Sequence, residues 1–452
     1  MIYMKRHIIS LLTVLAMAAA ALYSCSPVEM DFNLEPEKGR SDDDIVRIQV
    51  KEYKNVFLVY SMGFNDLRSY LKEDIEDLLS NPLMDNRRDV LLIFSHLANH
   101  YPDERYPRFS EPTSPILTKV YRNNNGQIQK DTLLVMPETT IAADKSTLNN
   151  ILEYTKENFP AETYGILLSS HGSGWVPAGY LNNPNKFDPQ SYAGETPLGA
   201  RLQKQATPSY NMGREGDIDV KSMGVHNITT SELLEMDITD IADSFPFKMD
   251  YIIFDACYMG GIEVAYELRN ITDNIIFSQT EILGDGMDYK TMISYLMHPD
   301  GPALEGFCQR YFDYYNSKSG QLRSATISLI DCSKLEDLAD VSRNIFEKYR
   351  RELTVLQGVR NVQGYYRNDQ KWFYDFGDIV EKCTPSKEDL ALFNEALSRA
   401  VLYKASTPSF LSSFNIKRHS GLSMYLPFTI KRKYLNNFYK TLEWNIDTGL
   451  IE

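Results

Sequence analysis

The stretch that most constrains the fold of this chain is residues 248–261, which read KMDYIIFDACYMGG. The four apolar residues 251–254 fit a short buried β-strand, and the triplet Asp-Ala-Cys that ends at Cys257 follows them directly. Two glycines and then a helical pattern come next. A strand that ends in a cysteine and turns into a helix places a thiol at the carboxyl edge of a sheet, where open α/β sheets hold their sites.

A thiol in this place is a candidate nucleophile. The positive end of the following helix is expected to lower the pKa of the Cys257 thiol, which favours the thiolate. Cysteine catalysis also needs a base that takes or shares the thiol proton and returns it to the leaving group. A second buried strand pattern, residues 164–170, ends at His171 and is followed by Gly172. The two strand ends therefore offer a nucleophile and a base, and the N–H of Gly172 is expected to help hold an oxyanion.

Each of these residues also has a purely structural interpretation. Cysteine is among the most buried residue types, and a lone histidine at a strand end is more often simply hydrogen-bonded. His96 also stands at a strand end and is a rival base, although no glycine follows it. The pairing of Cys257 with His171 therefore depends on the motifs around them.

The segments on either side alternate between strand and helix patterns. Residues 56–60 and 89–95 are apolar runs, and residues 67–79 between them carry apolar side chains at helical spacing. Two further strand patterns, residues 117–121 and 132–136, flank an Asn-rich turn and predict a hairpin. A strand, a helix and another strand in succession are typical of a parallel sheet, so we predict an α/β fold.

Several motifs resemble the clostripain family of cysteine peptidases, within the caspase-like clan. They occur in one order and together span most of the chain. The resemblance implies a caspase-like (caspase/haemoglobinase) fold, with a mostly parallel sheet flanked by helices and a C-terminal extension of helices and strands. The motifs are HGSGW at residues 171–175, DAC at 255–257, SQ at 278–279 and GDG at 284–286, with weaker echoes at 65–67 and 421–427.

The resemblance implies an endopeptidase that cleaves after Arg or Lys through a dyad of Cys257 and His171, with no third catalytic residue assigned. The backbone N–H groups of Gly172 and Cys257 are expected to hold the oxyanion. We also considered a non-catalytic surface lipoprotein that uses the same scaffold to bind a partner. Retention of both Cys257 and His171 counts against that alternative.

The specificity residue implied by the family pattern is Asp255, two residues before the nucleophile. Residues two apart on a strand point to the same face, so Asp255 and Cys257 are expected on one side of the sheet. A buried carboxylate there rewards a basic substrate side chain. The alternative is a structural aspartate that caps the following helix. Ser278, Asp285 and Asp288 are candidates to complete the pocket.

A long segment between the two catalytic candidates, residues 176–219, contains several Pro, Gly and Asn residues and no clear periodicity. Relatives in the resembled family commonly cleave themselves after a basic residue between the catalytic His and Cys. The resemblance therefore implies a zymogen loop, and an ordinary surface excursion is the equal alternative. The candidate cleavage residues are Lys186, Arg201, Lys204 and Arg214.

The first 25 residues have the pattern of a targeting segment, with a charged start and an apolar run that leads to Cys25. The sequence around Cys25 is similar to a bacterial lipobox, which predicts lipidation and a place in the cell envelope, either in the outer membrane and periplasm or at the surface. A plain secretory signal is the alternative. The predicted organisation is a signal at residues 1–25, a flexible tether at 26–50, a catalytic domain at 51–300 and an extension at 301–452.

Composition narrows the cofactors and partners. A net charge of −14 argues against a nucleic-acid binder, which would carry a basic surface. The remaining cysteines (Cys308, Cys332 and Cys383) have no paired spacing, so no disulfide framework is predicted. No metal-ligand spacing and no EF-hand loop occurs, and the proposed chemistry needs no cofactor, although calcium activates some relatives. We expect a monomer.

Overall fold

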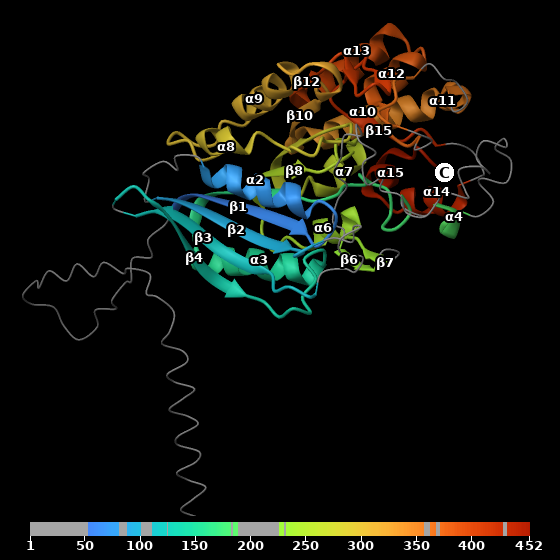
Figure 1. Ribbon diagram of the computed structural model, residues 1–452. Helices are drawn as coiled ribbons and strands as arrows, with labels where there is room; N and C mark the ends of the chain where they lie inside the picture. Colours follow the sequence, from blue (N-terminus) through green and yellow to red (C-terminus); the bar gives the residue numbers. More distant parts are fainter. Residues whose placement is uncertain are drawn as a thin grey trace, which may run out of the picture. The chain divides into compact units, whose positions relative to one another are not determined.

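The computed structural model describes one compact unit within residues 52–452 (Figure 1). Nothing in the sequence before residue 53 is described, so the predicted signal, the lipidation residue Cys25 and the tether lie outside the described part. The described ranges are 53–80, 88–100, 111–123, 125–181, 184–188, 226–229, 232–356, 362–367, 371–427 and 432–452.

A nine-stranded sheet forms the centre of this unit. Its five middle strands are parallel, and two antiparallel strands extend it at each edge. In spatial order the strands are β12 (Val401–Ser406), β10 (Thr326–Asp331), β9 (Thr272–Phe277), β8 (Met249–Asp255), β5 (Ala161–Ser169), β1 (Tyr53–Gly63), β2 (Asp89–Leu97), β3 (Ile116–Arg122) and β4 (Ile128–Val135).

Helices cover both faces of the sheet, because the central strands bury side chains on both sides (Figure 1). In β1, for example, Val56 and Leu58 belong to one core, whereas Phe57 and Val59 belong to the other. One face is covered by α2 (Arg68–Ser80), α8 (Tyr289–Leu296) and α9 (Leu304–Asn316). The opposite face is covered by α3 (Lys145–Asn158), α6 (Ile238–Asp243), α7 (Ile262–Leu268), α10 (Leu335–Lys348), α13 (Lys387–Ala400) and α15 (Glu443–Thr448).

Shorter elements complete the described part of the chain. Two small hairpins and one short strand pair lie outside the main sheet. They are β6 (His226–Thr229) with β7 (Glu232–Leu234), β13 (Ser409–Phe410) with β14 (Phe414–Asn415), and β11 (Tyr374–Asp375) with β15 (Ser423–Met424). The remaining described α-helices are α4 (Pro184–Phe187), α11 (Arg350–Leu356), α12 (Phe376–Lys382) and α14 (Lys433–Tyr439), and two short 3₁₀ helices are η1 (Gly320–Leu322) and η2 (Cys332–Lys334).

The C-terminal extension is an integral part of this unit. Its strands β10 and β12 continue the central sheet, and α10, α13 and α15 pack over α7 or over one another. Arg269 at the end of α7 stacks over the Tyr266 ring at 3.9 Å and forms an ion pair with Glu443 of α15. The boundary expected near residue 301 therefore does not separate two compact units.

The α/β fold and its mostly parallel central sheet are as predicted, and so is the hairpin that follows β2. The strand predicted over residues 421–427 is much shorter, because only Ser423 and Met424 pair with β11. Among the described helices, none is long and apolar enough to cross a membrane.

Candidate active site

Three neighbouring strands, β8, β5 and β1, end at the same edge of the sheet, and each is followed by a residue of the site. Ser169 of β5 pairs with Asp255 of β8, so His171 and Cys257 each lie two residues beyond the last paired position. Gly172 packs directly against the nucleophile candidate, since a Cβ there would lie 2.3 Å from the carbonyl oxygen of Cys257 and 2.8 Å from its nitrogen. The residue after His171 therefore packs against the Cys257 backbone, and only glycine fits there.

The Cys257 side chain is buried and its sulfur is engaged by the loop that follows β9. Its Sγ accepts a hydrogen bond from the backbone N–H of Ile282 at 3.3 Å. Burial, and then the nearby charge of Glu281, raise the pKa of the Cys257 thiol well above its usual value. The predicted lowering of this pKa is therefore wrong for this conformation, in which burial is the largest cause and α7 begins only at Ile262, beyond the two glycines.

A sharp backbone turn follows the nucleophile candidate. Tyr258 has a φ of 61°, in the left-handed region that residues other than glycine rarely occupy. Its ring stacks on Phe373, with centroids 4.6 Å apart and planes within 4°. Backbone geometry of this kind persists where surrounding packing imposes it, and it is concentrated at functional sites.

An ion pair between Arg367 and Glu281 lies next to Ile282, the residue that hydrogen-bonds to the Cys257 sulfur. Arg367 donates from Nη2 to Glu281 Oε1 at 2.8 Å and from Nε to the other carboxylate oxygen, so that the pair is bidentate. Arg367 comes from the C-terminal extension, as does Phe373, which also closes over Gly174 of the HGSGW motif. The C-terminal extension thus holds residues that neighbour Cys257 in the chain and in the loop that contacts its sulfur.

The His171 imidazole is buried and bonded to a residue that sequence reasoning did not assign to the site. Its Nε2 forms a hydrogen bond with Oδ1 of Asp66, which follows β1. Burial alone would raise the pKa of the Asp66 carboxyl, but the His171 ring lowers it below its usual value. The available signal was the weak echo at residues 65–67, placed just after a strand adjacent to the histidine strand.

Asp255 is completely buried, as a specificity residue at the base of a pocket would be. Its Oδ2 accepts hydrogen bonds from Ser169 Oγ at 3.0 Å and from the Tyr289 hydroxyl at 2.6 Å. Tyr289 is the first residue of α8. The carboxylate is therefore held between β5 and α8, and the helix that follows β8 is not capped by it, since α7 begins after Gly261.

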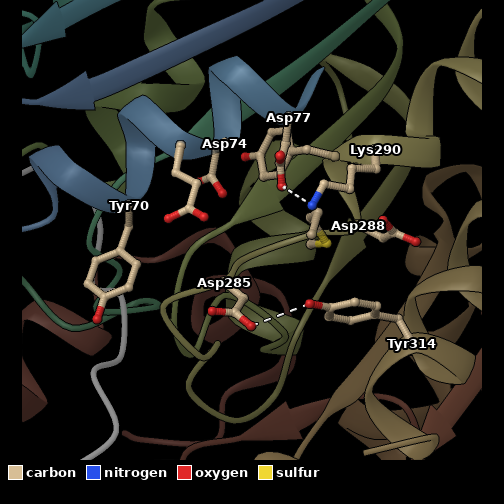
Figure 2. A pocket seen from close by; sticks show the side chains of 10 residues that line it. Tyr70, Asp74, Asp77, Asp285, Asp288, Lys290 and Tyr314 are labelled. Carbon is tan, nitrogen blue, oxygen red and sulfur yellow. Dashed lines mark hydrogen bonds and ion pairs between the residues drawn. The ribbon is translucent and has the colours of Figure 1, made fainter. Parts of the chain in front are cut away.

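An acidic cavity of about 150 Å³ adjoins this region, between α2 and the start of α8 (Figure 2). Asp285 points into it and accepts a hydrogen bond from the Tyr314 hydroxyl at 3.3 Å, and Lys290 pairs with Asp77 at 3.3 Å. Tyr289 lines the cavity while its hydroxyl contacts Asp255, so it connects the two sites. The other lining residues are Tyr70, Glu73, Asp74, Met287 and Asp288.

Ser278 lies elsewhere than the cavity, in a buried cluster of hydroxyl groups. Its Oγ is 2.8 Å from Thr326 Oγ1 and donates to the Thr280 carbonyl at 3.1 Å. The adjacent Gln279 packs so closely on Gly260 that a Cβ there would lie 2.4 Å from its side-chain nitrogen Nε2. The SQ motif therefore supports the turn after Cys257. Of the three predicted pocket residues on this loop, Asp285 and Asp288 line the cavity and Ser278 does not.

The remaining candidates take other positions. Lys186 is exposed on α4, whereas Arg201, Lys204 and Arg214 lie outside the described residues. The rival base His96 places Nε2 3.0 Å from the Thr113 carbonyl oxygen. Among the residues that the structure describes, no group of three or more His, Cys, Asp or Glu residues is arranged to hold a metal ion.

Comparisons with known proteins find relatives of this chain. The model of the clostripain family matches residues 59–187 and 217–448. Clostripain from Hathewaya histolytica is 22% identical over 489 residues, covering 94% of this chain and 85% of that protein.

Solved structures show the same architecture. An inactive zymogen C11 protease from Parabacteroides distasonis is 25% identical with a TM-score of 0.67, and the match covers 88% of this chain and 98% of that one. A secreted C11 cysteine protease from Bacteroides thetaiotaomicron is 24% identical with a TM-score of 0.66, and the match covers 88% of this chain and all of that one (100%). Because the family model matches most of this chain, the chain belongs to the clostripain family of cysteine proteases.

Proposed function

We propose that this protein is an envelope-located endopeptidase that cleaves after Arg or Lys, with Cys257 as nucleophile and His171 as base. The observation that carries the specificity is the buried carboxylate of Asp255, joined through Tyr289 to a cavity lined by further acidic residues. A basic side chain that enters this region gains charge-assisted hydrogen bonds, whereas an uncharged one leaves the carboxylates unpaired. The matched relative clostripain supports the assignment.

The chemistry proposed for the pair is acyl transfer. The thiol proton passes to His171 as Sγ attacks the scissile carbonyl carbon, and the N–H groups of Gly172 and Cys257 stabilise the oxyanion. The imidazolium then gives its proton to the amine, and the C–N bond breaks to leave a thioester. Water attacks the thioester with His171 as base, which releases the acid and restores the thiol.

Activation is proposed to require a conformational change, because Cys257 is buried in the described conformation. Cleavage within residues 176–219 is the candidate trigger, with Lys186 exposed on α4 and the other three basic candidates elsewhere in that segment. One of the matched structures is itself described as an inactive zymogen. We also retain the lipid anchor at Cys25 as part of the proposal, together with activity without a cofactor and as a monomer.

The experiment that tests the proposal is hydrolysis of fluorogenic peptidyl-Arg, peptidyl-Lys and peptidyl-Ala amides by the chain without residues 1–25. We expect turnover of the basic substrates only, and two fragments on a gel. Cys257→Ala should stay intact and inactive, whereas Cys332→Ala, a buried cysteine on another element, should keep activity. If no amide is cleaved, even after trial nicking with trypsin, a partner-binding role becomes the better account.

The specificity residue has its own prediction. Asp255→Asn should lower kcat/KM for the Arg and Lys substrates by at least about 100-fold, because the charge that pairs with the substrate is removed. Asp250→Asn, at the opposite end of β8, removes the same charge and should change kcat/KM by less than about threefold. If Asp255→Asn cleaves the Arg and Lys amides as fast as the unmodified chain, the specificity is set elsewhere.

A further inference from the structure

The residue at the end of β1 has a role in the site that the two-residue account leaves out. We propose that Asp66 is a positioning residue, which orients the His171 ring and makes Nδ1 the nitrogen that exchanges a proton with Cys257. The orientation of the ring is inferred from the hydrogen bond between Asp66 and His171. The effect of that orientation on catalysis rests on the proposed acyl-transfer function.

The topology places three residues of the site at one edge of the sheet. β8, β5 and β1 are consecutive, and Cys257, His171 and Asp66 follow them in that order. The strand that carries the imidazole therefore lies between the strands that carry the thiol and the carboxylate. A nucleophile, a base and an orienting group in sequence is the arrangement that nucleophilic catalysis uses repeatedly on unrelated folds.

The turn that carries Asp66 is fixed by its neighbour. Asn65 is completely buried, donates from Nδ2 to the Met62 carbonyl at 2.9 Å and accepts the Leu67 N–H at 2.9 Å. Ser170, the residue before the histidine, donates to the same Met62 carbonyl at 2.9 Å. The ends of β1 and β5 are therefore tied together directly beside the Asp66–His171 contact, which restricts the position of both side chains.

The chemistry of the contact selects the histidine tautomer. An ionised carboxylate can only accept hydrogen bonds, so the Nε2 atom that faces Asp66 carries the proton. In the neutral ring the lone pair then resides on Nδ1, so in this proposal Nδ1 takes the thiol proton. When Nδ1 is protonated, the adjacent carboxylate stabilises the imidazolium. The His171 side chain is 1% exposed and therefore shielded from water, whereas the Asp66 side chain is 22% exposed and only partly shielded.

Substitution separates this role from a structural one. With a peptidyl-Arg amide as substrate, Asp66→Ala should lower kcat by about 10²- to 10⁴-fold with little change in KM, because the effect falls on the transition state. Asp66→Asn should shift the acidic limb of the kcat/KM profile to lower pH, since a protonated ring loses its negative neighbour. Asp144→Ala removes the cap of α3 and should lower thermal stability without moving the profile.

A measurement that needs no turnover tests the tautomer itself. In protein labelled with ¹⁵N-histidine, two-bond ¹H–¹⁵N correlation spectra distinguish protonated from unprotonated ring nitrogens. His171→Gln assigns the signal among the seven histidines. We expect Nε2–H for His171 in the otherwise unmodified chain and a mixture of tautomers in Asp66→Ala.

The outcomes are distinguishable. If the unmodified chain cleaves no basic amide, the proposed function fails, and the tautomer measurement still decides the role of Asp66. If the unmodified chain is active and Asp66→Ala retains kcat within about threefold, or if His171 carries its proton on Nδ1, the proposal is overturned.

Discussion

At the scale of single residues, the site combines groups whose environments are set by burial. Glu263, in the first turn of α7, is completely buried and accepts hydrogen bonds from the Tyr425 N–H at 2.7 Å and the Tyr439 hydroxyl at 2.9 Å. Burial raises the pKa of Glu263 to about 7. A carboxyl group that holds the nucleophile's helix to the C-terminal extension is thus partly protonated near neutral pH.

This residue predicts a pH-dependent stability. The folded pKa of about 7 lies above the usual 4.5, so the folded state binds the proton more tightly and this group destabilises the fold as pH rises from 4.5 to 7. The full difference corresponds to about 3 kcal/mol at 1.36 kcal/mol per pH unit. In thermal melts, the Tm of Glu263→Gln relative to the unmodified chain should rise over this range and level off above it.

The control is Glu153→Gln, at an exposed position of α3. Its melting temperature should follow the unmodified chain at every pH. A Glu263→Gln difference that does not vary between pH 4.5 and 8 would contradict the buried-carboxyl account.

At the scale of elements, access to the thiol depends on the loop after β9 and on the segment that carries Arg367. The ion pair between Glu281 and Arg367 joins these two elements, and Glu281 precedes the residue that hydrogen-bonds to Cys257 Sγ. Its carboxylate also raises the pKa of the thiol, after burial itself. Neutralising Glu281 therefore breaks the ion pair that joins the two elements, and it also removes a negative charge that disfavours the Cys257 thiolate.

We expect Glu281→Gln to speed alkylation of Cys257 by iodoacetamide at least severalfold, measured by peptide mass spectrometry over time. Both effects act in the same direction, because the thiol becomes more accessible and its ionised form less disfavoured. Glu162→Gln, which breaks an exposed ion pair with Arg88, is the matched control and should leave the rate unchanged. Equal rates in the two variants would show that the ion pair does not restrict the thiol.

At the scale of the whole molecule, the C-terminal extension stabilises the catalytic part. Trp444 of α15 is fully buried and packs edge-on against Tyr266 of α7 and Phe376 of α12. Trp444→Ala should lower the free energy of unfolding by about 3–5 kcal/mol, measured by denaturant titration, because a large cavity opens in the core. Ile446→Ala on the same helix is 65% exposed and should cost less than about 1 kcal/mol. Similar losses for both would mean that α15 is not part of the core.

Sequence patterns predicted those parts of the molecule that depend on local order. The apolar runs that end at His171 and Cys257 are β5 and β8, and their parallel pairing places both residues at the same edge of the sheet. Asp66 could not be assigned in this way, since its contact depends on β1 lying next to β5 and on the turn built by Asn65.

The burial of Cys257 could not be predicted from its surroundings in the sequence either. Its neighbour Tyr258 stacks on Phe373, and Arg367 pairs with Glu281, beside the residue that hydrogen-bonds to its sulfur; both partners lie more than 100 positions later in the chain. Long-range packing of this kind overrides a local expectation, here the effect of a helix terminus on the thiol, because desolvation is the larger electrostatic cost.

The central claim is that Cys257 is the nucleophile of a site selective for basic side chains. Its most direct test is covalent labelling of the chain without residues 1–25 by peptidyl-arginyl, peptidyl-lysyl and peptidyl-alanyl chloromethyl ketones, followed by peptide mapping. We predict a single adduct on Cys257 with the two basic reagents, lost in His171→Ala and Asp255→Asn. Adducts on another residue, or equal labelling by the alanyl reagent, would contradict the account.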